Sequence, residues 1–294
     1  MRKDSSLSPS LSSYSLSSSN ECDGSLYEGC SFTQSNRPTL TSTNTTFISC
    51  TFASLRSSEN GSAIYCTGND IKLCIKGCFF QSCESSSGFG GAIYIEDISS
   101  FFVTKTVFFN CKSTNKRGGG LYFTSSCYFP LVSDTSFISC YARNYDSIAD
   151  PCDDGGGLII FCSLPSSQLN YILQSCRFLS YGCNDFAGGG YIVLSSSRIG
   201  CTGCLFSGCK CSNAEGIGIS LDTADANVLI VFCFFSCTAG SNSPTDITIN
   251  YHAESFSSSP IFHSFSTKDP SKSVSTCVSW QNYQYRNWLP HASN

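Results

Sequence analysis

Hydrophobic residues along this chain alternate with other residues in short groups that return at a regular interval. Each group follows a glycine-rich segment, and its first and third residues are apolar while the residue between them varies. A period of two indicates a β-strand with one buried face. No stretch has apolar residues at the 3.6-residue spacing of an amphipathic helix, so we expect no helical repeats. The first residues of the groups are Ile64, Ile93, Leu121, Leu158, Tyr191 and Ile219, and the third are Cys66, Ile95, Phe123, Ile160, Val193 and Leu221.

A Phe-x-x-Cys tetrad marks another strand in each unit. An apolar residue stands five positions before most of these phenylalanines, and a small residue stands two positions before them. Most tetrads follow the previous one by 28 or 29 residues, and a fixed period of about 20–50 residues is the signature of a solenoid. The tetrads are Phe47–Cys50, Phe80–Cys83, Phe108–Cys111, Phe137–Cys140, Phe206–Cys209 and Phe234–Cys237, with Phe178–Tyr181 as a variant that lacks the cysteine.

Three short strands in each unit predict an all-β fold, a single-domain parallel β-helix of about seven turns. In such a fold each strand lies on its equivalent in the next turn, about 4.8 Å away. The tetrad residues then form two buried ladders along the solenoid. The phenylalanine ladder is Phe47, Phe80, Phe108, Phe137, Phe178, Phe206 and Phe234, and the cysteine ladder is Cys50, Cys83, Cys111, Cys140, Cys209 and Cys237.

The segment Gly90-Gly91-Ala92-Ile93, combined with the tetrads, resembles the repeats of the polymorphic outer membrane proteins. Those repeats pair Gly-Gly-Ala-Ile with Phe-x-x-Asn, and here cysteine stands in place of the asparagine. The resemblance covers residues 44–250. It implies a right-handed parallel β-helix of the pectin-lyase-like type, displayed at a cell surface or secreted and used in adhesion. It implies no catalytic residues, because the family motif contains none.

The repeat divides the chain into four parts. Residues 1–20 form a serine-rich arm with too little apolar surface to fold, so we expect disorder there. Residues 21–43 are an N-terminal cap or degenerate turn, 44–250 are the β-helix repeats, and 251–294 are a degenerate turn and C-terminal cap. An aromatic cluster in the last part is expected to cap the open end of the solenoid, with an interface as the alternative. It consists of Trp280, Tyr283, Tyr285 and Trp288.

Charge and hydropathy limit the partners of the chain. It has 17 basic and 21 acidic residues, a net charge of −4 and no basic run, so we expect no nucleic-acid partner. No apolar run approaches the ~18 residues that a membrane span requires. Residues 1–19 also lack the continuous apolar core of a signal peptide. The residues alone leave two readings of the location, a cytosolic protein or a fragment of a longer one.

Twenty-one cysteines in an acidic, serine-rich chain suggest an oxidising compartment. In an in-register ladder, however, Cβ atoms lie about 4.8 Å apart, whereas a disulfide needs about 3.8 Å, so we expect buried free thiols in the tetrads. Loops can adjust their spacing, and Cys183 and Cys211 both stand five residues after their phenylalanine; they are the disulfide expected in an oxidising compartment. Cys201 and Cys204 have zinc-site spacing but fall in inward columns, so we expect no metal and no cofactor.

One insertion interrupts the repeat, between Cys140 and Gly155. Inserted loops often lie on the working face of a solenoid. Polysaccharide hydrolases and lyases need a carboxylate pair or a calcium cluster, and the best candidates here are Asp146, Asp150, Asp153 and Asp154 with Arg143. Adjacent acids on a strand point to opposite faces, so we expect no catalysis and treat Arg143, Asp153 and Asp154 as candidate ligand contacts. A carbohydrate-active enzyme that uses residues 141–154 is the alternative.

Tyr65, Tyr94 and Tyr122 occupy the variable, outward position in three successive units. Stacked at the strand spacing, they would offer an aromatic strip to a glycan or an extended peptide. Ladders of this kind also simply stabilise neighbouring strands. The sequence therefore predicts a non-catalytic surface or adhesion-type binding module for a glycan or a protein, whose contact surface combines the tyrosine strip with the insertion.

Overall fold

The computed structural model shows a chain whose described strands all pair in parallel. The described residues are 25–34, 38, 40, 44–125, 130–143, 156–162, 169–179, 182–183, 190–194, 198–211, 219–223, 228–231, 234–239, 247–251, 261–263, 266–267 and 275–277. The expected disordered arm, the acids of the insertion and the C-terminal aromatic cluster lie outside this part of the chain.

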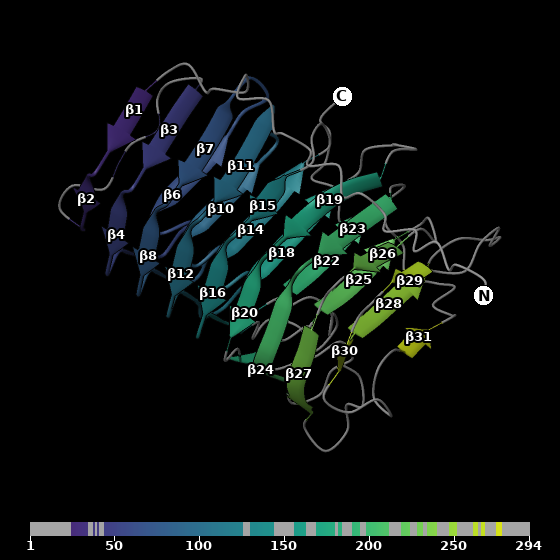
Figure 1. Ribbon diagram of the computed structural model, residues 1–294. Helices are drawn as coiled ribbons and strands as arrows, with labels where there is room; N and C mark the ends of the chain where they lie inside the picture. Colours follow the sequence, from purple (N-terminus) through teal and green to yellow (C-terminus); the bar gives the residue numbers. More distant parts are fainter. Residues whose placement is uncertain are drawn as a thin grey trace, which may run out of the picture.

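The strands form three sheets, called A, B and C here (Figure 1). Sheet A contains β1 (Ser25–Glu28), β3 (Asn44–Ile48), β7 (Lys72–Lys76), β11 (Ser100–Thr104), β15 (Leu131–Ser133), β19 (Leu169–Gln174), β23 (Arg198–Thr202), β26 (Val228–Val231) and β29 (Ile261–His263). Sheet C contains β6 (Ile64–Thr67), β10 (Ile93–Glu96), β14 (Leu121–Ser125), β18 (Leu158–Cys162), β22 (Gly190–Leu194), β25 (Ile219–Thr223), β28 (Ile247–Tyr251) and β31 (Ser275–Cys277).

Sheet B has two arms that meet at one long strand, β24 (Leu205–Cys211). The main arm contains β2 (Ser31–Phe32), β4 (Thr51–Ala53), β8 (Phe79–Gln81), β12 (Val107–Phe109), β16 (Ser136–Ile138) and β20 (Arg177–Leu179), with β27 (Phe234–Ala239) and β30 (Ser266–Thr267) beyond β24. The short arm contains β5 (Arg56–Ser57), β9 (Glu84–Ser85), β13 (Lys112–Ser113), β17 (Tyr141–Ala142) and β21 (Gly182–Cys183).

Each turn of the chain passes through sheet A, the main arm of sheet B, its short arm and sheet C. Four such turns follow one another from β3 to β18, and Figure 1 shows their strands stacked side by side. Residues 28 apart lie opposite each other, as Ile93 and Leu121 do. The predicted all-β parallel solenoid is therefore confirmed for the described residues, among which there is no helix. Accordingly, no helix in the described part of the chain could span a membrane.

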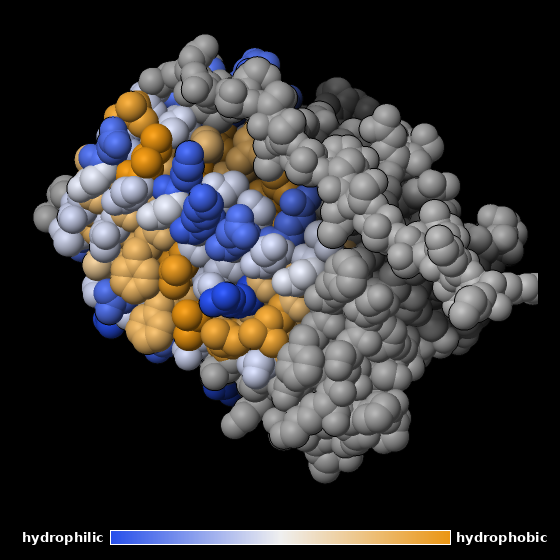
Figure 2. All heavy atoms as spheres, in the orientation of Figure 1, coloured by the Kyte–Doolittle hydropathy of each residue, from blue (hydrophilic) through white to orange (hydrophobic). Residues whose placement is uncertain are grey.

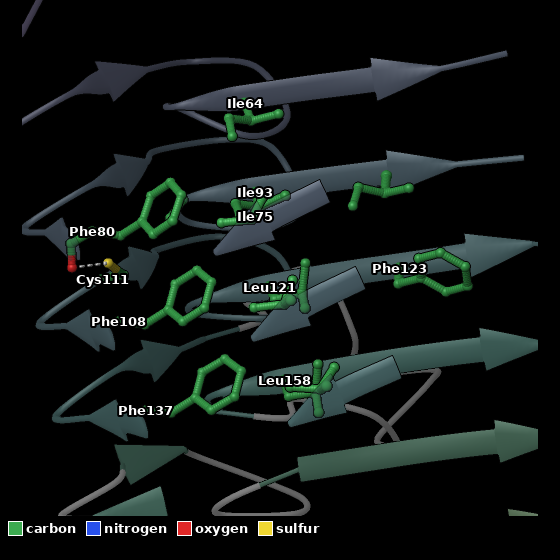
Figure 3. Packing of buried hydrophobic residues seen from close by; sticks show 14 of the residues in the cluster. Ile64, Ile75, Phe80, Ile93, Phe108, Cys111, Leu121, Phe123, Phe137 and Leu158 are labelled. Atoms are coloured by element: carbon green, nitrogen blue, oxygen red, sulfur yellow. Dashed lines mark hydrogen bonds between the residues drawn. The ribbon is translucent and has the colours of Figure 1, made fainter. Parts of the chain in front are cut away.

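The interior holds a stack of phenylalanine rings contributed by sheet B. Phe80, Phe108 and Phe137 lie one above another in Figure 3, beside the aliphatic side chains of sheet C. Each ring is fully buried and nearly parallel to its neighbours. The centroid distances are 4.4 Å for Phe52–Phe80, 4.8 Å for Phe80–Phe108, 4.7 Å for Phe108–Phe137, 5.1 Å for Phe137–Phe178 and 4.6 Å for Phe178–Phe206. This spacing follows from the distance between parallel strands.

The start of the ladder differs from the sequence prediction, because Phe52 and not Phe47 lies next to Phe80. Phe47 lies in sheet A, where it pairs with Ile75. The prediction for Cys50 is wrong for the same reason: its backbone N–H lies 3.4 Å from the sulfur of Cys78, in the neighbouring ladder of small residues. The 28-residue interval leads back from Phe80 to Phe52, so continuous strand pairing overrides the local Phe-x-x-Cys match.

Two further positions shift by one residue. Phe206 pairs with Phe235, so Phe234 does not continue the ladder. In sheet C, Tyr191 lies opposite Ile159 and not opposite Leu158, which pairs with Gly190. A shift of one residue exchanges the two faces of a strand. The pairing between strands is what identifies the inward residue where two adjacent residues are both apolar.

Candidate binding surface

The tyrosine column on sheet C has the predicted order. Tyr94 pairs with Tyr65 on one side and with Tyr122 on the other. The ring centroids are 5.5 Å apart for Tyr65 and Tyr94 and 5.3 Å apart for Tyr94 and Tyr122, with interplanar angles of 6° and 9°. Rings stacked in this way cover one another's faces, so Tyr94 has no free face for a sugar ring to stack on.

Tyr94 is also shielded from solvent, with 7% of its surface exposed. The ring of Phe89 lies 6.4 Å from the ring of Tyr94 and 4.8 Å from that of Tyr122. The Tyr94 hydroxyl donates a hydrogen bond of 3.1 Å to Oε2 of Glu96. Burial, and then the negative charge of Glu96, raise the pKa of Tyr94, so the hydroxyl stays protonated. The strip is therefore a packed column, and Tyr65, which is 48% exposed, is its accessible end.

The column continues into Ile159, which pairs with Tyr122 and is fully buried although it stands in the outward position. Tyr122 and Phe161 pack against Ile159. On the insertion side, Arg143 is half-buried and its backbone N–H donates a hydrogen bond of 3.0 Å to the carbonyl oxygen of Ser113. Asp153 and Asp154 lie outside the described residues, so the contact surface that combines them with the tyrosine column stays a prediction.

The tetrad thiols of Cys83, Cys111 and Cys140 lie inside the solenoid. Their sulfur atoms lie 3.6, 3.5 and 3.6 Å from the carbonyl oxygens of Phe52, Phe80 and Phe108 in the preceding turn, and each donates to that oxygen; Figure 3 shows the bond from Cys111. Burial raises the pKa of the Cys111 thiol well above its usual value. All three are free thiols that satisfy backbone carbonyls.

The remaining predicted cysteines lie partly beyond the described side chains. Strand pairing places Cys183 opposite Cys211, on adjacent turns, as the loop spacing predicts. Their side chains are not described, so the disulfide stays a prediction. Cys209 and Cys237 belong to β24 and β27, whose pairing shifts between Ser207 and Lys210. Cys201 and Cys204 are buried in the core, and no cluster of metal-ligating side chains occurs among the described residues.

A second surface, which the sequence reasoning missed, lies on the outer face of the main arm of sheet B. Five apolar side chains point outward from β8, β12, β16 and β20 and are half-buried or exposed, with Phe109 38% exposed. Figure 2 shows apolar side chains gathered over these strands. We call this surface the outer patch; it consists of Phe79, Val107, Phe109, Ile138 and Leu179. The sequence does contain a signal for this patch, because a residue beside the tetrad phenylalanine is apolar in successive units.

Charged side chains border the outer patch. Lys105 and Asp134 are exposed at the corner between sheets A and B, and Arg177 is exposed at the start of β20. Lys105 and Asp134 have left-handed backbone angles, with φ values of 51° and 47°, which turn the chain sharply from one sheet to the next. Within the described residues, the ion pair between Arg56 and Glu84 lies on the short arm and involves none of the three.

Comparison of the chain with protein-family models, with curated proteins and with solved structures finds no match. The arrangement of the described residues is therefore the basis for assigning a function.

Proposed function

We propose that this chain is a non-catalytic binding module that holds a protein partner on the outer patch. The observation that carries the proposal is the set of five outward apolar side chains on four adjacent strands. A contiguous apolar surface rimmed by charged residues is typical of protein contacts. A glycan contact through the tyrosine column is less well supported, because the rings of Tyr65 and Tyr122 cover the two faces of Tyr94.

The rigidity of the site supports the same function. Parallel pairing fixes β12 between β8 and β16 on both sides, so its outward side chains need little further ordering on binding. Two further parts of this proposal rest on the repeat resemblance. One is a right-handed, pectin-lyase-like solenoid of about seven turns, and the other is display at a cell surface, or secretion, for adhesion. A stacked solenoid of this kind offers an extended face to a partner.

An array of purified proteins and glycans tests the proposal, with an assay for released sugar products run alongside. We expect the full chain to bind at least one protein and to release no product. Phe109→Lys should abolish that binding, because it places a charge in the apolar contact, while Tyr65→Ala should leave it unchanged. Glycan binding that is lost in Tyr65→Ala, or any product released by the chain, would contradict the proposal.

A further inference from the structure

The outer patch and its charged border have a pattern that is complementary to itself. Parallel in-register strands repeat every 28 or 29 residues between β8 and β16, so each position along a strand forms a straight column over successive turns. Two copies of the chain can pack face to face about a two-fold axis that runs parallel to the strands, midway between β12 and β16. Each column of one copy then faces the same column of the other copy. The axis exchanges β12 with β16 and β8 with β20 between the two copies.

The charged border is the first feature that this axis matches. Lys105 precedes β12 by two positions and Asp134 precedes β16 by two positions, so both belong to one column on adjacent turns. The axis places Lys105 of each copy opposite Asp134 of the other, which gives two equivalent ion pairs at the edge of the contact. Neither side chain takes part in an ion pair with another described residue. Opposite charges that meet in this way set the register of an interface.

The same axis gives an apolar pair at the centre of the contact and places two other apolar side chains against polar ones, since Val107 faces Ser136 and Leu179 faces Gln81 of the second copy. Phe109 meets Ile138 of the second copy, and Phe79 meets Arg177, whose guanidinium can lie over an aromatic ring. Sheets that pack face to face lie about 10 Å apart, a distance that side chains of this size fill. An axis parallel to the solenoid would instead place Arg177 opposite Leu179 and would separate Lys105 from Asp134. The charges therefore select the axis that runs along the strands.

We propose that the partner on the outer patch is a second copy of this chain, joined face to face through β8, β12, β16 and β20 with the two solenoids antiparallel. A two-fold interface uses the same surface on both subunits, which the self-complementary columns provide. This inference rests on the proposed function, since it names the protein that the outer patch binds.

Charge exchange tests the inference by sedimentation velocity of the full chain over a range of concentrations at low salt. We expect Lys105→Asp and Asp134→Lys each to weaken dimerisation by about tenfold or more, since each change creates two like-charge contacts. The double variant Lys105→Asp/Asp134→Lys should restore the dimer, because the opposite charges meet again. Lys72→Asp is the matched control, an exposed lysine on the outer face of sheet A, and should leave dimerisation unchanged.

Three results would overturn the inference. They are a monomer at every concentration, single variants that dimerise normally, and a double variant that is not rescued. The protein and glycan array, with the chain itself included among its proteins, separates failure of this dimer from failure of the proposed function. A monomer that still binds another protein through Phe109 removes only the second copy as partner. A chain that binds no protein in a Phe109-dependent way removes both proposals.

Discussion

At the scale of single residues, the thiol of each tetrad acts as a small polar group that fits a strand corner. The sulfur of Cys111 lies 3.5 Å from the carbonyl oxygen of Phe80 in the preceding turn and 3.7 Å from that of Phe109, two residues earlier, so the two oxygens share its single S–H proton. The Phe109 oxygen also accepts the backbone N–H of Ser82 at 2.9 Å, so the thiol is a second, weak donor to that oxygen. Cysteine in this position therefore combines a weak donor with apolar burial that a side-chain amide would lack.

Thiol reactivity should follow this burial. In the folded chain at pH 8, iodoacetamide should modify Cys30 and Cys74, which are half-buried, and should leave Cys66 and Cys111 unmodified. Burial raises the pKa of Cys66 to about 12, so almost none of the reactive thiolate is present at that pH. Peptide mass spectrometry before and after denaturation measures the difference. Rapid native labelling of Cys111 would show that the tetrad ladder is not buried.

At the scale of the structural element, glycines allow the chain to turn into sheet C. Gly90 precedes β10 with a φ of +66°, and a Cβ atom there would collide with the carbonyl oxygen of Ile93. Gly29 has a similar φ of +62° but has open space around its Cα. The two glycines therefore separate the cost of the backbone angle from the cost of the collision.

Gly90→Ala should destabilise the fold more than Gly29→Ala. The backbone angle alone costs about 1–2 kcal/mol for a residue with a side chain, and this is the whole effect expected at Gly29. At Gly90 the added methyl must also displace backbone of its own turn, so the loss should be clearly larger. Urea unfolding followed by circular dichroism gives both values. Equal losses in the two variants would mean that the turn can move to accommodate the methyl group.

At the scale of the whole molecule, stability is a sum over neighbouring turns, because each turn contacts mainly the turns before and after it. A ring in the middle of the phenylalanine stack has two stacked neighbours, as Phe137 has in Phe108 and Phe178. Phe32 stacks on Phe52 only, and it is edge-on to Tyr27 and Phe47. The centre of the solenoid should therefore depend more strongly on each ring than its N-terminal end does.

Phe137→Ala should cost about 3–5 kcal/mol, the usual range for removing a buried aromatic side chain. Phe32→Ala should cost less, since it removes one stacked contact and leaves a smaller cavity at the end of the stack. The free energies of unfolding of the two variants, compared with that of the parent chain, test this order. A larger loss at Phe32 would show that the first turn organises the rest.

The repeat could be found from sequence because a solenoid stacks equivalent residues, so its three-dimensional period is also a period of the chain. The 28-residue interval and the alternation of apolar residues were sufficient to predict parallel strands, the phenylalanine stack from Phe80 to Phe206 and the order of the tyrosine column. These features depend on local spacing. The alternation of residues within a strand indicates which of its two faces is buried.

Only the tertiary structure decided which residues pair and which are covered. Phe47 and Phe52 are both followed by a plausible repeat, and the choice between them depends on hydrogen bonds to a strand 28 residues away. Tyr94 stands in an outward position, yet Tyr65 and Tyr122 stack on it and Phe89, from the loop before β10, packs beside it. Alternation assigns a residue to a face of its strand, but the exposure of that face depends on side chains that reach it from other segments.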